Sequence, residues 1–148
     1  MKKTIKKLAL VLLIAALMLI VAGCSATDYK TATNLMNGGD VAAAAEAFRA
    51  LGDYKDSSAL ATACDYKAAK NTYDAGDYEQ ARALFAALGD YEDSASLVTS
   101  CDYATAKKAY DAGEYDKAAE LFTALGDYED SVSLAAQSGD KALAEKLL

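Results

Sequence analysis

The feature that most constrains this chain is a sequence repeat with a period of 37 residues. Residues 73–94 and 110–131 align without a gap and are identical at 16 of 22 positions. The repeat includes every aromatic residue, because the ten tyrosines and three phenylalanines fall into sets spaced by 37 residues. Arrays with such periods bury the apolar face of each unit against its neighbours. We therefore expect the aromatic residues to serve the repeat and not a unique site.

Each unit contains two glycines followed by an acidic residue, and these divide it into two segments. One set is Gly39, Gly76 and Gly113, and the other is Gly52, Gly89 and Gly126. Glycine often ends a helix in the left-handed conformation, and the next aspartate can cap the following helix. The sequence predicts long helices near 54–75 and 91–112 and short helices near 78–88 and 115–125. A half-length helix near 28–37 precedes them and a helix near 128–147 follows. Asp56, Asp93 and Asp130 are alternative caps for the long helices.

Apolar periodicity predicts which helix faces are buried. A single stripe on the second short helix contains Tyr115, Ala118, Phe122 and Leu125, at spacings of three, four and three. The long helix before it carries two stripes on different sides, Leu97-Cys101-Ala104 and Tyr103-Ala106-Tyr110. Such a helix needs neighbours on both sides, and stacked helical hairpins would provide them.

At the hairpin turn the chain resembles the tetratricopeptide repeat (TPR) family. The family has glycine and tyrosine at the turn, alanine three residues later and an aromatic residue four beyond, as in Gly113, Tyr115, Ala118 and Phe122 and in Gly76, Tyr78, Ala81 and Phe85. Two departures are the period, 37 instead of 34, and the absence of the proline that usually ends the second helix. The resemblance implies an all-α, right-handed helical-hairpin solenoid of three 37-residue TPR-like repeats. Its units are expected at about 28–64, 65–101 and 102–138, with a C-terminal capping helix at 139–148.

The first 23 residues are typical of an export signal. Four lysines, Lys2, Lys3, Lys6 and Lys7, precede an apolar or small-residue run from Leu8 to Gly23. The run ends in Val21-Ala22-Gly23-Cys24, which resembles the lipobox of bacterial lipoproteins. The resemblance implies a signal peptide at 1–23, a lipidated Cys24 with a short linker at 24–27, and a lipid-anchored protein on the extracytoplasmic face of a bacterial membrane. An uncleaved signal anchor with a chance Gly-Cys is the alternative.

Composition and charge exclude several classes of function. The net charge of the 148 residues is −7, and without the first 23 residues 11 basic face 22 acidic side chains. Nucleic-acid binding needs a basic face, so we expect no such partner. The chain has no histidine, which excludes Ser-His-Asp and Cys-His catalysis and a His-ligated zinc site. We expect no enzymatic activity and no cofactor apart from covalent lipid on Cys24.

Two features could carry chemistry but also have structural explanations. Cys64 and Cys101 are one repeat apart, and a disulfide is one interpretation in an exported protein. Equivalent positions of stacked hairpins lie about 9–10 Å apart, beyond the usual disulfide reach of about 7 Å, so small buried side chains are favoured. The acidic turns could bind a cation, but the spacing of a calcium loop is absent and helix capping is favoured, so we expect no metal site. These turns contain Asp53, Asp56, Asp90, Glu92, Asp93, Asp127, Glu129 and Asp130.

The sequence therefore predicts a module that binds a protein or peptide, with the membrane reached through its lipid anchor. A structural spacer or assembly element of the cell envelope, without a peptide-binding groove, is the alternative. Candidate contact residues are those that break the repeat on the long helices: Lys67, Lys70, Asn71, Lys107 and Lys108. Four lysines on neighbouring helices would form a basic patch for an acidic partner segment, although solvated helix faces have the same composition. The identity of the partner does not follow from the sequence.

Overall fold

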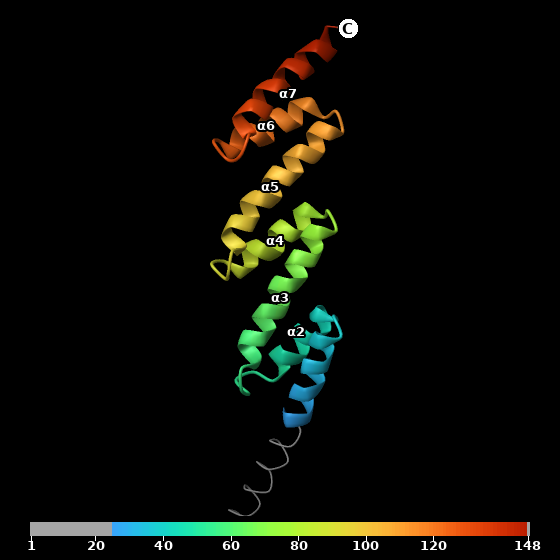
Figure 1. Cartoon of the computed structure of the whole chain (residues 1–148), viewed down its shortest axis with the longest axis vertical. Helices are drawn as coiled ribbons and strands as arrows, with labels where there is room; N and C mark the ends of the chain where they lie inside the picture. Colours follow the sequence, from blue (N-terminus) through green and yellow to red (C-terminus); the bar gives the residue numbers. More distant parts are fainter. Residues whose placement is uncertain (1–24, 148) are drawn as a thin grey trace, which may run out of the picture. The chain divides into compact units, whose positions relative to one another are not determined.

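The computed structural model describes residues 25–147, and every regular element among them is a helix (Figure 1). This confirms the all-α class. Residues 25–37 form the first described helical segment. It is followed by α2 (Val41–Ala50), α3 (Ser57–Asp74), α4 (Tyr78–Leu88), α5 (Ser94–Asp111), α6 (Tyr115–Leu125) and α7 (Ser131–Lys146). The chain divides into two compact units, Met1–Asp65 and Tyr66–Leu148, and α3 contributes to both.

The short helices have the predicted bounds, but α3, α5 and α7 each begin three residues later than predicted. The first helix begins earlier than the predicted residue 28, because residues 25–27, predicted as part of a linker, are already helical. Helices α4 and α6 confirm the segments 78–88 and 115–125. Helix α5 was expected from Tyr91 and begins at Ser94, and α3 begins three residues late in the same way. The cause is a turn in which two residues have positive φ, Gly89 at 59° and Glu92 at 49°. Apolar periodicity does not reveal such a turn, because its tyrosine keeps the spacing of the buried face.

Acidic residues cap some of these helices and not others. The Asp40 carboxylate accepts a hydrogen bond from the Ala43 backbone N–H at the start of α2. Asp77 accepts one from the Gln80 N–H in the same way at the start of α4. Glu114 stands at the start of α6 without such a bond and pairs instead with the ammonium of Lys117 at 2.9 Å.

In the first unit, the core lies between residues 25–37, α2 and the amino-terminal half of α3. Phe48 of α2 is fully buried, and the Tyr29 ring meets it edge-on with centroids 5.7 Å apart. The Tyr54 ring also packs against the Tyr29 ring, with the two centroids 5.9 Å apart. The Lys55 ammonium lies 4.4 Å from the centroid of the Tyr29 ring. Cys64, 1% exposed, is buried as predicted for a small side chain.

In the second unit, α5 separates two apolar clusters. Cys101 and Leu97 of α5 belong to the cluster that contains Phe85 of α4. Ala106 and Tyr103, on another face of α5, belong to the cluster that contains Phe122 of α6. The structure thus confirms that this long helix has neighbours on both sides. The Cys101 thiol is free and buried, and burial raises its pKa.

A hydrogen bond between tyrosine and aspartate recurs with the repeat. Tyr29 Oη donates to Asp56 Oδ1 at 2.6 Å, and Tyr66 donates to Asp93 and Tyr103 to Asp130 in the same way. Neither Asp93 nor Asp130 accepts a backbone N–H of the helix that it precedes. The alternative caps of the long helices therefore bind a tyrosine hydroxyl through their side chains.

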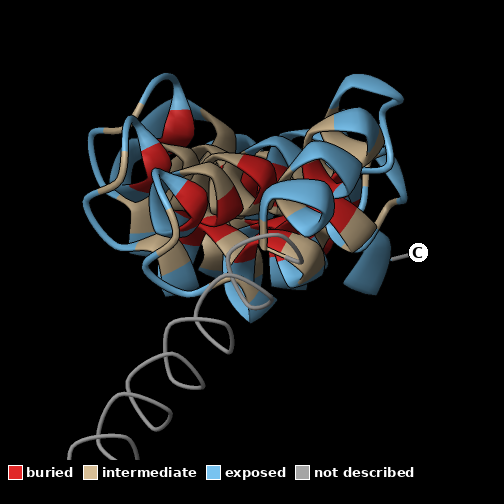
Figure 2. Cartoon of the chain, turned by 90° about the horizontal axis from the view of Figure 1, so that it is seen from below, coloured by how far each residue is buried: buried red, intermediate tan, exposed pale blue. Residues whose placement is uncertain are grey.

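Burial follows the helices and leaves the turns exposed. Figure 2 shows the buried positions on helical segments and the connecting turns as mostly exposed. A small residue opens each long helix at a fully buried position, namely Ser57, Ser94 and Ser131. The backbone N–H of each serine donates to the carbonyl of the tyrosine three residues earlier, so these buried positions join the turn to the helix and leave no space for a larger side chain.

Candidate partner-binding surface

The five residues predicted to contact a partner are all exposed. Lys67, Lys70 and Asn71 lie on the carboxyl-terminal half of α3, and Lys107 and Lys108 lie on α5. All five belong to the unit Tyr66–Leu148, so their surroundings can be compared directly.

Two of these lysines occupy equivalent places beside a tyrosine four residues earlier. The ammonium of Lys70 lies 5.7 Å from the centroid of the Tyr66 ring. The ammonium of Lys107 lies 6.0 Å from that of Tyr103. Both contacts follow from helix geometry, in which residues four apart are neighbours on one face. They leave the charges exposed and able to meet a ligand.

A hollow of about 580 Å³ lies beside Lys107 and Lys108. One wall comes from the end of α3 and the turn into α4, and the other from α5. The lining residues are Tyr73, Ala75, Gly76, Tyr78, Tyr103, Ala104, Lys107, Lys108 and Asp111. Tyr73 and Tyr78 meet edge-on with ring centroids 5.2 Å apart. We call this space the tyrosine-lysine hollow.

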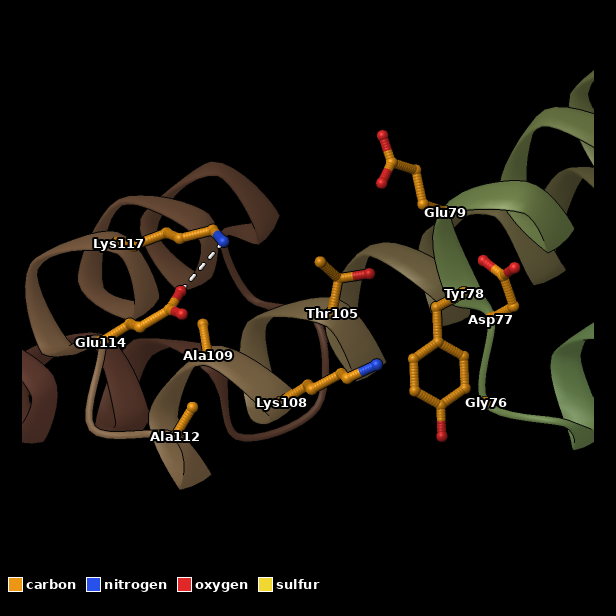
Figure 3. A pocket seen from close by; sticks show the side chains of 10 residues that line it. All are labelled: Gly76, Asp77, Tyr78, Glu79, Thr105, Lys108, Ala109, Ala112, Glu114 and Lys117. Atoms are coloured by element: carbon orange, nitrogen blue, oxygen red, sulfur yellow. Dashed lines mark hydrogen bonds and ion pairs between the residues drawn. The ribbon is translucent and has the colours of Figure 1, made fainter.

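A second hollow, of about 290 Å³, adjoins the first and shares Gly76, Tyr78 and Lys108 with it. Figure 3 shows the Lys108 side chain extending toward Tyr78, with Asp77 and Glu79 projecting from the start of α4. On the opposite side Lys117 is neutralised by Glu114. The carboxylates of Asp77, Glu79 and Glu114 make this second hollow poorly suited to an acidic ligand. Its lysine near Tyr78 is Lys108, which also lines the tyrosine-lysine hollow.

The chemistry of the tyrosine-lysine hollow is aromatic and locally basic. Two lysines face one carboxylate, that of Asp111, among its lining residues. Burial raises the pKa of Tyr73, and the hydrogen bond to Asp130 raises that of Tyr103 to about 12. Both phenols are therefore neutral at physiological pH. The hollow can take a flat or apolar group against its rings and a carboxylate against its ammonium groups.

The structure brings together part of the predicted set. Lys107 and Lys108 line the tyrosine-lysine hollow, whereas Lys67, Lys70 and Asn71 are exposed on α3 and do not line it. Sequence reasoning missed Tyr73, Tyr78 and Tyr103, which it assigned to the repeat as a whole. Their identity as tyrosine was the available signal, because a half-buried tyrosine has one polar and one apolar end, unlike the fully buried phenylalanines.

Three further points concern the membrane and metals. Cys24, the predicted lipidation site, lies outside the residues that the structure describes. Within residues 25–147, no helix combines the length and hydropathy needed to cross a membrane. The same residues hold no group of three or more cysteine, aspartate or glutamate side chains placed to share a metal ion.

Comparison of the chain with protein-family models, with curated proteins and with solved structures finds no significant match.

Proposed function

We propose that the chain is an exported lipoprotein, held on the extracytoplasmic face of a bacterial membrane by lipid on Cys24, that binds a protein or peptide. The observation that carries the binding role is the tyrosine-lysine hollow, with three tyrosines and two lysines on its walls. The proposal involves no catalytic step, since the chain has no histidine and its aromatic residues follow the repeat.

The helical hairpins are proposed to form a right-handed TPR-like solenoid. Three observations support this: the glycines at the hairpin turns have positive φ, α5 is covered on two faces, and the tyrosine-aspartate bonds recur every 37 residues. In such an array successive long helices line a common surface. A ligand in extended conformation could then continue beyond one hollow.

The ligand is proposed to carry a carboxylate beside an aromatic or aliphatic side chain. Without residues 1–23 the chain has 22 acidic against 11 basic side chains, so an acidic ligand is repelled by most of its surface. Lys107 and Lys108 give one place where that repulsion is locally reversed. A general negative field with a local basic site favours binding in one register.

A matched pair of charge reversals tests the site. Capture of partners from an envelope extract is compared for Lys107→Glu/Lys108→Glu and for Lys67→Glu/Lys70→Glu. Both variants change four charge units on exposed lysines of long helices, and Lys70 and Lys107 are repeat equivalents. We expect the first variant to lose capture and the second to retain it, with unchanged helical circular dichroism in both. Retained capture by the first variant would place the binding surface on the short helices or the turns and not at the hollow, whereas a parent protein that captures no partner would favour the spacer role.

The lipid anchor is tested separately. Mass spectrometry of the wild-type protein should find acylated Cys24 as the first residue, and Cys24→Ser should leave the precursor uncut by the lipoprotein-specific peptidase. Recovery of intact Met1 from membranes of wild-type cells would instead identify a signal anchor.

A further inference from the structure

Helices α4 and α6 each begin with a tyrosine that meets a second tyrosine near the end of the preceding long helix. Tyr73 and Tyr78 form one pair, with ring centroids 5.2 Å apart. Tyr110 and Tyr115 form the other pair, with ring centroids 5.5 Å apart. The two pairs occupy equivalent positions of successive repeats, so they can be compared as two copies of one aromatic pair.

The pair of Tyr110 and Tyr115 already holds a cation from the same chain. The ammonium of Lys141, on α7, lies 4.3 Å from the centroid of the Tyr110 ring and 4.9 Å from that of the Tyr115 ring. A hydrogen bond to Tyr110 raises the pKa of Lys141, so the charged form of the lysine is favoured there. A cation near two aromatic rings is attracted by both of them. This aromatic pair is therefore a cation site that a side chain of the protein itself occupies.

The pair of Tyr73 and Tyr78 has an alanine at the place of this lysine. Ala104 of α5 is the repeat equivalent of Lys141, and it lines the tyrosine-lysine hollow together with both tyrosines. Helix α3 has Lys67 at the same place, so Ala104 is the exception among the three long helices. The hollow of about 580 Å³ thus lies beside an aromatic pair whose equivalent binds an ammonium group.

Carboxylates near Tyr78 offset the two lysines of the hollow. Asp111 lines the tyrosine-lysine hollow itself, and Asp77 and Glu79 line the second hollow, which also includes Tyr78. Figure 3 shows Asp77 and Glu79 at the start of α4, where Tyr78 also lies. Three carboxylates therefore surround the aromatic pair against two ammonium groups, so its surroundings as a whole do not repel an added cation.

The sign of charge one helical turn further on also differs between the two sites. Glu145 follows Lys141 by four residues, whereas Lys108 follows Ala104 by four residues. Residues four apart are neighbours on one face of a helix. The occupied site thus has a cation and a carboxylate from the protein. The hollow lacks that cation, and in place of the carboxylate it has a lysine, which can bind a carboxylate of a ligand.

We propose that the tyrosine-lysine hollow binds a lysine side chain of a peptide ligand, with its ammonium over Tyr73 and Tyr78 in the way that Lys141 lies over the equivalent pair. The inference rests on the proposed function and defines its ligand further, because the side chain beside the ligand's carboxylate is then that of lysine. The aliphatic stem of this lysine packs against the rings and Ala104, and the carboxylate binds the two lysines of the hollow.

A lysine introduced at position 104 tests the cation site without any ligand. In the full chain, held in detergent micelles, Ala104→Lys should place an ammonium over Tyr73 and Tyr78. Nuclear magnetic resonance of ¹³C-methylated lysines detects this, because aromatic rings shift the methyl signals of an ammonium that lies over them. Lys141 is the internal reference, and Lys141→Ala identifies its signal. We expect an additional shifted signal from Ala104→Lys. A signal at the position of solvated lysines would overturn the proposal.

Two dipeptides with blocked termini test the chemistry of the ligand. One is lysyl-glutamate, and the other has norleucine in place of lysine, which keeps the aliphatic stem and lacks the ammonium. Binding to the full chain is followed by the ring signals of labelled Tyr73 and Tyr78. We expect the norleucine dipeptide to bind about fivefold more weakly. Ala104→Lys should abolish binding of the lysine dipeptide, and Ala104→Ser, which stays small, should retain it. Equal affinities would overturn the proposal in favour of an apolar occupant, as would absence of binding by the lysine dipeptide.

Capture from the envelope extract separates failure of this inference from failure of the proposed function. Ala104→Lys occupies the hollow and leaves Lys107 and Lys108 in place, and we expect it to lose capture as their charge reversal does. Capture that survives Ala104→Lys but is lost on charge reversal would overturn the lysine inference and leave the proposed function intact. Capture that survives charge reversal would overturn the proposed function, whereas the measurements on Tyr73 and Tyr78 do not depend on it.

Discussion

Helices α5 and α7 occupy equivalent positions in successive repeats, yet α5 is covered on two faces and α7 on fewer. The face of α5 that contains Ala106 packs against α6 in a cluster with Phe122. The corresponding face of α7 contains Leu143 and is exposed. The difference shows how sequence drift in a repeat follows burial. Where the next helix packs closely, alanine is retained, and where no described residue covers the face, a larger side chain is present.

Substitution of buried phenylalanines should give the largest effect and show how firmly each helix is held. Phe85→Ala should cost about 3–5 kcal/mol of unfolding free energy, because its fully buried ring packs in a cluster with residues of both α3 and α5. Phe122→Ala should cost at least about 1 kcal/mol less, since α7 can shift to fill the cavity. Urea unfolding followed by circular dichroism measures both. Equal costs would mean that α7 is held as firmly as α5.

A reciprocal exchange tests the comparison directly. Ala106→Leu, which gives α5 the residue of α7, should destabilise the protein by about 1–3 kcal/mol because it overfills a buried contact. Leu143→Ala, the reverse change, should stay within about 0.5 kcal/mol of the parent at low protein concentration. The measurement is again urea unfolding. A large loss from Leu143→Ala in dilute solution would show that this face is covered within one chain.

The two short helices that cover α5 differ at the N-cap residue that precedes each of them, and this difference provides a smaller test. Asp77→Ala should cost about 1 kcal/mol, because Asp77 accepts the Gln80 N–H at the start of α4. Glu114→Ala should cost less than half of that, since Glu114 makes an exposed ion pair with Lys117 and caps no backbone N–H. Thermal unfolding of the two variants gives the ranking. A larger loss at Glu114 would mean that its ion pair outweighs a helix cap.

The smallest effect concerns a feature that α5 and α7 share, a tyrosine hydroxyl bonded to the aspartate at their start. The bond to Asp93 raises the pKa of Tyr66 from 10.0 to about 12, which favours the neutral phenol in the folded state. The contribution of this hydrogen bond to the stability of the folded state is therefore complete below pH 10 and is lost between pH 10 and about 12. Asp93→Asn should lower the pKa of Tyr66 toward 10, as measured by tyrosinate absorbance. Tyr103, bonded to Asp130, should keep a pKa of about 12 in that variant and serves as an internal control.

Local signals in the sequence predicted most of the fold. The short helix α4 was placed at its observed bounds because Gly76 and Gly89 stop the chain on either side and Asp77 caps it. The predicted start of α5 was wrong by three residues. Glu92 has a positive φ, which is uncommon for residues other than glycine and which the sequence therefore did not indicate. Asp93 was correctly weighed as an alternative cap position, but its bond to Tyr66 joins residues 27 apart and leaves no local pattern.

The candidate site was predicted less completely than the fold. Lys107 and Lys108 were selected as residues that break the repeat, although Lys107 repeats Lys70, and both line the tyrosine-lysine hollow. Lys67 and Lys70 were selected in the same way and do not line the hollow, because its walls come from residues 73–78 and 103–111. Comparing equivalent positions of the repeats shows which residues differ between them. Which of them border the same empty space depends on how the helices cross.

The tyrosine-aspartate bonds also bear on how the chain acquires its structure. Each joins residues only 27 apart, as in the bond from Tyr29 to Asp56. Contacts of short sequence separation form quickly, because little chain entropy is lost in closing them. During synthesis each tyrosine can meet its aspartate once fewer than 30 further residues have emerged, so folding can advance with the growing chain without waiting for its end. Under a pulling force the same bonds would be expected to break one after another, each releasing about one repeat of chain.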